Sequence, residues 1–267
     1  MKSFYIDRLS VRAAKIASIS IAAMAISSLS ASAQVLNLNF GRVNDGPLFG
    51  GSGSYTGQGA YTDTGNNKWN NLLWSGGATP PSGSTLTSLS YSDNTAASGV
   101  SISFTGSGIT SENYNSGIGT SENQMLYGFA LSNTTNANQT SVNILGLLAN
   151  TNYTLYVYAQ KSNSTGTTFK VNSDSYSLAG GTGAQSAGFV QDVNYHIFAN
   201  EATDNTGKLS INWYANLTGT GSFTQGPFNG LQLVKGAASV PEPGAIALVG
   251  GIAVIGGSLA VRRKRRK

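Results

Sequence analysis

The sequence predicts an all-β fold, an antiparallel β-sandwich flanked by an N-terminal signal helix and a C-terminal transmembrane helix. Two observations on residues 34–239 predict the sandwich. Apolar and polar residues alternate in short runs, and no stretch keeps an apolar period of 3.6 residues. Clusters of Gly, Ser, Asn and Thr separate these runs, as is typical of loops between strands. We therefore expect one domain of two packed sheets.

Residues 1–33 have the three parts of a secretory signal peptide. A basic segment is followed by the apolar run 16–29 and then by Ala31-Ser32-Ala33, a small-x-small cleavage motif. At about 1.5 Å per residue the apolar run spans about 21 Å, which is less than the roughly 30 Å bilayer core. We therefore expect cleavage between Ala33 and Gln34, the alternative being a retained anchor.

Residues 240–267 form a second candidate targeting signal. Pro241, Glu242 and Pro243 precede the uncharged segment 244–261, which at about 1.5 Å per residue is just long enough to cross a bilayer. The chain then ends in a basic cluster, which the positive-inside rule holds on the cytoplasmic side. Its arginines are Arg262, Arg263, Arg265 and Arg266. We expect a transmembrane helix over 244–261.

This order of Pro-Glu-Pro, one apolar span and a terminal arginine cluster resembles the PEP-CTERM sorting signal of Gram-negative bacteria. The resemblance implies recognition of the tail by an exosortase, at least transient membrane contact through 244–261, and delivery to the cell surface or extracellular matrix. An ordinary C-terminal anchor is the alternative. Whether the tail is cleaved stays open.

The expected strands follow the alternation along the body. They lie at 36–40, 100–104, 142–144, 153–158, 169–171, 193–197, 209–213 and 231–233. The order of segments such as Leu38-Asn39-Phe40-Gly41 and Phe228-Asn229-Gly230-Leu231 resembles galactose-binding-like and malectin-like modules. That resemblance implies a jelly-roll-like sandwich and a carbohydrate ligand.

Charge and composition exclude several classes of function. The formal net charge of +5 comes from the two ends, because residues 34–239 hold six basic and nine acidic residues. A nucleic-acid partner is therefore not expected. The chain has no Cys, which excludes disulfides and thiolate metal sites, and one His, which excludes a multi-His metal site. We expect no cofactor.

The segment 55–74 is the densest mixture of aromatic and amide residues. Aromatic rings stack on the apolar faces of sugars, and amides and carboxylates bind their hydroxyl groups. Candidate carbohydrate-binding residues are Tyr61, Asp63, Trp69 and Trp74. The alternative is a loop whose tryptophans plug the edge of the core. Asp63 could also contact Ca²⁺, but the body has no D-x-D-x-D run, so no metal site is expected.

The sequence evidence for catalysis by residues 34–239 is weaker than the evidence for binding. Glu112 and Glu122 belong to a repeated Thr-Ser-Glu-Asn turn, and a pair of carboxyls could hydrolyse a polysaccharide. His196 is expected on a strand face opposite Tyr195, facing solvent, and no nucleophile elbow accompanies it. No catalytic residue is therefore expected.

The sequence thus predicts an exported, exosortase-sorted, non-enzymatic surface or matrix protein that binds exopolysaccharide or envelope glycans. A polysaccharide hydrolase and a self-assembling adhesin are the alternatives.

Overall fold

The structure is a computed structural model. It describes the following residues: 34–43, 55, 57–62, 67–75, 85–106, 109–113, 126, 128–135, 140–180, 188–219 and 221–236. Contacts between Cα atoms group Ala33–Gly236 into one compact unit. The predicted signal helix, Ala31, Ala33 and the sorting tail 240–267 lie outside the described residues. In the described ranges no helix is long and apolar enough to cross a bilayer.

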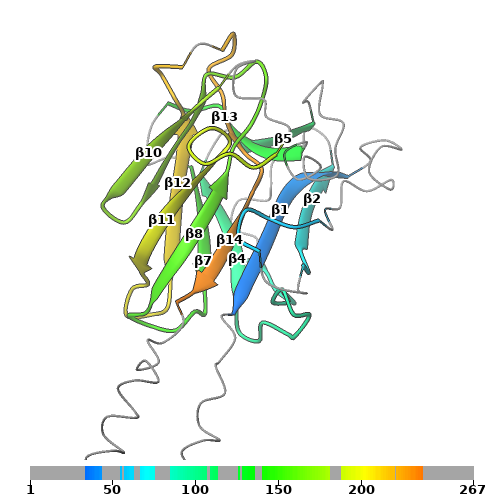
Figure 1. Cartoon of the computed structure of the whole chain (residues 1–267), viewed down its shortest axis with the longest axis vertical. Helices are drawn as coiled ribbons and strands as arrows, with labels where there is room; N and C mark the ends of the chain where they lie inside the picture. The colour runs from blue at the N-terminus through cyan, green and yellow to red at the C-terminus, as the bar shows by residue number, and fades with distance from the viewer. Residues whose placement is uncertain are drawn as a thin grey trace, which may run out of the picture. The chain divides into compact units, whose positions relative to one another are not determined.

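The described part of the chain forms three β-sheets (Figure 1). The first has the spatial order β11 (Tyr195–Ala202), β8 (Asn152–Tyr158), β14 (Gly230–Lys235), β1 (Val35–Val43) and β2 (Asn70–Ser75). The second has the order β10 (Asp174–Ala179), β9 (Gly166–Val171), β12 (Leu209–Ala215), β7 (Thr140–Leu145), β4 (Ser101–Gly106) and β3 (Thr85–Leu86). The third has the order β13 (Gly226–Phe228), β6 (Gly128–Ser132) and β5 (Ile109–Asn113).

The prediction of an all-β fold with antiparallel sheets is confirmed, with one difference. β1 and β2 pair in parallel, with Leu38 opposite Asn70. A parallel pair needs a long crossover between its strands, and the chain from Val43 to Asn70 is long enough to provide one. The first and last strands of the unit, β1 and β14, are antiparallel neighbours. As a result the amide of Lys235 donates a hydrogen bond to the carbonyl of Gln34 at 3.0 Å.

Alternation places one face of each large sheet in a common core. In β8 the side chains of Tyr153, Leu155 and Val157 are buried in this core, while Thr154 and Tyr156 are partly exposed on the other face. Leu209, Ile211 and Trp213 of β12 enter the same core from the second sheet. This period of two is the reason the sequence pattern locates these strands correctly.

An aromatic cluster joins the three sheets. Phe228 of β13 is fully buried, and its ring centroid lies 4.9 Å from that of Phe40, 4.8 Å from Phe169 and 5.4 Å from Trp213. All three contacts are edge-on, the arrangement in which the positive edge of one ring meets the negative face of another. Phe228 therefore connects the third sheet to both larger ones.

Phe228→Ala should destabilise the protein strongly, because it leaves a cavity where all three sheets meet. We expect the free energy of unfolding to fall by about 3–5 kcal/mol. Urea denaturation, monitored by tryptophan fluorescence, measures this change. The control is Leu148→Ala, whose side chain is 55% exposed and whose loss should change stability by no more than about 0.5 kcal/mol. Equal effects of the two substitutions would contradict the assignment of Phe228 to the core junction.

Candidate functional site

A buried glutamine organises the outer face of the first sheet. Gln232 of β14 lies opposite Asn37 of β1 and Tyr156 of β8, and its side chain is 2% exposed. Its Nε2 donates to Asn37 Oδ1 and to the carbonyl of Tyr61, both at 3.0 Å. Its Oε1 accepts from the Tyr61 amide at 2.9 Å and from the Tyr158 hydroxyl at 2.5 Å. Both donors and both lone pairs of the amide are thus used.

These bonds fix residues 57–62 against the sheet. The Tyr158 hydroxyl also accepts a hydrogen bond from the amide of Ala60 at 2.8 Å. The chain passes so close to the sheet at Gly59 that a Cβ there would lie 2.2 Å from Gln232 Oε1. Only glycine fits at this position without displacing the glutamine.

Trp69 is part of the same support. Its ring is 3% exposed and meets the Tyr55 ring edge-on, with centroids 4.9 Å apart. Its Nε1 donates to the carbonyl of Gly57 at 2.9 Å. Both the face and the polar edge of Trp69 are therefore occupied by the protein, so this predicted binding residue holds the segment in place.

The other predicted binding residues are placed differently. The backbone of Trp74 lies in β2 opposite Arg42, but its side chain is outside the described residues, as is all of Asp63. Tyr61 is half-buried at the surface of the first sheet. Of the two candidates whose side chains are described, Tyr61 is therefore the more exposed and Trp69 is buried.

Two tyrosines that are distant from Tyr61 in the sequence lie beside it on this surface. The ring centroid of Tyr156 of β8 lies 5.7 Å from that of Tyr61, and 6.3 Å from that of Tyr195 of β11, with the second pair stacked. All three side chains are half-buried. Burial is the main cause that raises the pKa of Tyr156 and of Tyr195 above the ordinary value, so both hydroxyls stay protonated at neutral pH. We call Tyr61, Tyr156 and Tyr195 the tyrosine face.

The chemistry of the tyrosine face is that of an aromatic surface edged by hydroxyl groups. Apolar ring atoms can pack against the C–H face of a sugar, and the hydroxyls can donate to or accept from its oxygens. No pattern in the sequence identified Tyr156 and Tyr195, because they lie far along the chain from the segment 55–74. The alternation of Tyr156 with the core residues Leu155 and Val157 was the available signal, since it places Tyr156 on the outer face.

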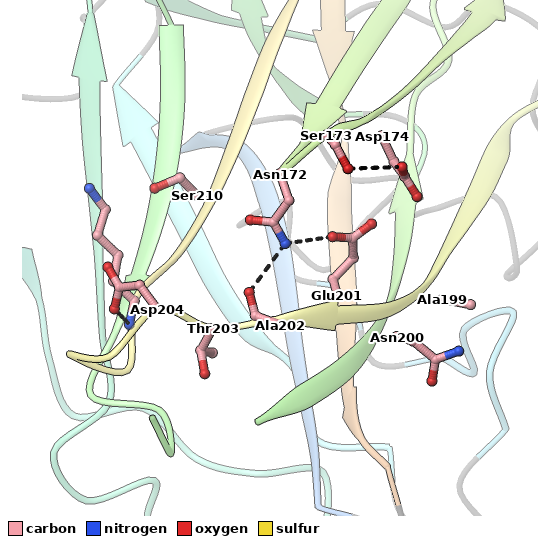
Figure 2. A pocket seen from close by; sticks show the side chains of 11 residues that line it. Asn172, Ser173, Asp174, Ala199, Asn200, Glu201, Ala202, Thr203, Asp204 and Ser210 are labelled. Carbon is pink, nitrogen blue, oxygen red and sulfur yellow. Dashed lines mark hydrogen bonds between the residues drawn. The ribbon is translucent and has the colours of Figure 1, made fainter. Parts of the chain in front are cut away.

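A polar cleft lies beside the end of β11 (Figure 2). Its volume is about 520 Å³, and it lies between the β9–β10 turn and the end of β11. Glu201 is 4% exposed, and its Oε2 accepts from Asn172 Nδ2 at 2.6 Å. Asn172 Nδ2 also lies 3.2 Å from the carbonyl of Ala202, so one amide connects the turn to β11.

A second carboxyl faces Glu201. Burial raises the pKa of Glu201, and the nearby negative charge of Asp174 acts in the same direction, whereas the hydrogen bond from Asn172 lowers it. A β-bulge between Phe198 and Glu201 directs Glu201 into the cleft. Asn172 and Asn200 both have positive φ, at 51° and 61°. Asparagine tolerates this conformation, which suits both the β9–β10 turn at Asn172 and the bulge in β11 at Asn200.

The single histidine lies between the two large sheets. The His196 ring stacks on Tyr176 of β10 with centroids 3.7 Å apart, and its Nδ1 is 2.6 Å from Asp192 Oδ1. His196 does lie on the face opposite Tyr195, as predicted. The prediction that it faces solvent is wrong, because its side chain is 17% exposed and is covered by the Tyr176 ring.

The predicted alternative pair, Glu112 and Glu122, cannot be located as a pair. Glu112 lies in β5 opposite Phe129, and not in a loop, while its side chain and all of Glu122 are outside the described residues. Among the residues that the structure describes, no three acidic or histidine side chains are grouped so as to hold a metal ion.

Comparisons with known proteins do not assign this chain to a family. No family model and no curated protein matches the chain. The extracellular domain of ANXUR1 from Arabidopsis thaliana is similar over 76% of this chain and 49% of its own length, at 13% identity and a TM-score of 0.38. A Paenibacillus xanthan lyase is similar over 52% of this chain and 12% of its own length, at 16% identity and a TM-score of 0.29. The chain thus spans half or less of the length of either protein.

Gln232→Leu should release the segment 57–62, because the hydroxyl of Tyr158 and the backbone of Tyr61 lose their partner. We expect the free energy of unfolding to fall by about 1–3 kcal/mol, and proteases to cleave within 57–62 more readily. The matched control is Gln58→Leu, the same change at an exposed glutamine of that segment. If both variants resist proteolysis equally, the glutamine does not anchor the segment.

Proposed function

We propose that the protein is an exported surface or matrix protein that binds exopolysaccharide or envelope glycans through the tyrosine face. The observation that carries this proposal is the contact series of Tyr61, Tyr156 and Tyr195 on a supported sheet surface. The supports beneath it, Gln232 and Trp69, are buried and fully bonded, so the rings are held in place before a ligand arrives. Preorganisation of this kind reduces the entropy lost on binding.

Export and sorting of the protein are part of the same proposal. A cleaved signal ending at Ala33 and a tail recognised by an exosortase would deliver residues 34–239 outside the cytoplasm, where such glycans occur. We further propose that the two large sheets form a jelly-roll-like sandwich. The shared core between these sheets and the pairing of β1 with β14 support this arrangement.

A polysaccharide hydrolase that uses a pair of carboxyl groups is the alternative to binding without catalysis. Glycosidases separate their two carboxyl groups by roughly 5–10 Å, so that the sugar and water fit between them. Glu201 and Asp174 both line the polar cleft, and release of product from a glycan is the observation that would favour this alternative. A self-assembling adhesin without a ligand is the remaining alternative, and it predicts association of the protein that sugar does not change.

Replacing the tyrosines tests the binding proposal. Tyr61→Ala, Tyr156→Ala and Tyr195→Ala should each weaken retention on a glycan array about tenfold, which corresponds to about 1.4 kcal/mol of binding free energy. The control is Tyr214→Ala, because Tyr214 is equally half-buried but lies in β12 of the second sheet. Equal losses in all four variants, with folding intact by circular dichroism, would show that the tyrosine face is not the binding surface. Product released from any glycan would instead favour an enzyme.

Replacing residues of the tail tests the proposed sorting role. Changing Arg262, Arg263, Arg265 and Arg266 together to Glu should prevent delivery to the surface, because it removes the positive charge that retains this end in the cytoplasm. The matched control changes the same four residues to Lys and preserves the charge. Fractionation of cells that contain an exosortase, with external protease as the probe, measures the exposed fraction. Unchanged delivery of the Glu variant would contradict the proposed sorting role.

A further inference from the structure

A small cavity lies where the first strand begins and the last strand ends. The start of β1 and the end of β14 are antiparallel neighbours, with Val35 opposite Val234 (Figure 1). The cavity at this end of the first sheet has a volume of about 220 Å³. Its lining includes Gln34, Leu36, Tyr91, Tyr153, Leu233 and Lys235. Gln34, the residue just before β1, is therefore part of the cavity wall.

The backbone of Gln34 is held in place while the residue as a whole is exposed. Its carbonyl accepts a hydrogen bond from the amide of Lys235 at 3.0 Å, and the next residue, Val35, is fully buried. Gln34 itself is exposed to solvent. Burial therefore does not keep the side chain amide away from the backbone nitrogen of the same residue.

These two groups can react with each other once the chain begins at Gln34. Cleavage after Ala33 would turn the nitrogen of Gln34 into a free α-amine, which can attack Cδ of its own side chain. A bond forms between the amine and Cδ, and the bond from Cδ to Nε2 breaks. Nε2 leaves as ammonia and takes the proton that the amine gives up. The product is a five-membered lactam, and no co-reactant is needed because one residue supplies both groups.

The charges around the cavity favour this neutral product. A free α-amine is mostly an ammonium ion at neutral pH, since its ordinary pKa is about 8. Of the residues that line the cavity, Lys235 carries a positive charge and none is acidic. Asp93 acts on Tyr91 from outside the lining, and its carboxylate accepts hydrogen bonds from Thr95. An ammonium at Gln34 would therefore have a like charge beside it and no counter-ion in the lining, whereas the lactam has no charge.

We infer that Gln34 is a modification site, converted in the mature protein to an N-terminal pyroglutamate whose neutral ring lies at the edge of this cavity. The inference rests on the proposed export, because Gln34 keeps its peptide bond if the chain is not cleaved after Ala33. Aminopeptidases require a free α-amine. The lactam would therefore protect the start of β1 from stepwise removal outside the cytoplasm.

Peptide mapping of the full chain after export tests the modification. The protein is recovered from the envelope of a Gram-negative host, its free amines are acetylated, and trypsin then cleaves after arginine only. The wild type should give the peptide 34–42 without an acetyl group and lighter by one ammonia than its sequence requires. Gln34→Asn is the matched control, because the same attack would form a strained four-membered ring. Its peptide should carry one acetyl group.

The two ways to fail give different peptides. A peptide 34–42 that begins with an acetylated glutamine would overturn the modification and leave the proposed cleavage intact. A longer peptide, up to 13–42 for a signal that is wholly retained, would show that the chain is not cleaved after Ala33. That result would overturn both the cleavage and the modification.

Thermal unfolding of the mature proteins tests the charge argument separately. Gln34→Asn keeps an ammonium beside Lys235 and should melt on the order of 1–2 °C below the wild type. Adding Lys235→Gln to this variant should restore the melting temperature, because it removes the like charge, while the same change should leave the cyclised wild type unaffected. If Lys235→Gln shifts both proteins equally, the lactam does not lie at the cavity as inferred.

Discussion

The buried amide of Gln232 is the constraint on which the outer face of the first sheet depends. A side chain amide removed from water must find partners for two donors and two lone pairs, or lose on the order of 1–3 kcal/mol. Gln232 finds them in Asn37, Tyr158 and the backbone of Tyr61. Those bonds specify how the segment 57–62 crosses the sheet, and thereby where the Tyr61 ring lies beside its two neighbours.

β11 places two kinds of chemistry on opposite sides of one edge strand. Tyr195 contributes an aromatic ring to the outer face, while His196 and Glu201 face the second sheet. An edge strand has a ladder on one side only, so the side chains of its free edge determine how firmly it is held.

The strands with strong alternation could be predicted from the sequence, and the others could not. β8 and β12 were predicted because Leu155, Val157, Ile211 and Trp213 alternate with polar residues. β10 was missed because it is an exposed edge strand with one fully buried side chain. β5, with the sequence ITSEN, was missed because it is short and polar, and β2 because Leu72 and Leu73 are adjacent and hide the period. The parallel pairing of β1 and β2 was also unforeseen, since periodicity does not specify which strands become neighbours.

The amino-acid pattern alone was enough to predict the all-β class and the aromatic segment that contributes Tyr61 to the candidate site. Local alternation encodes these properties, because it fixes which side of a strand a residue faces. Tertiary packing was needed to show that Trp69 is buried, that Tyr156 and Tyr195 join Tyr61, and that Glu201 contacts Asn172. Each of these facts depends on contacts between strands distant in the chain, and side chain packing across sheets selects those contacts after the local pattern is satisfied.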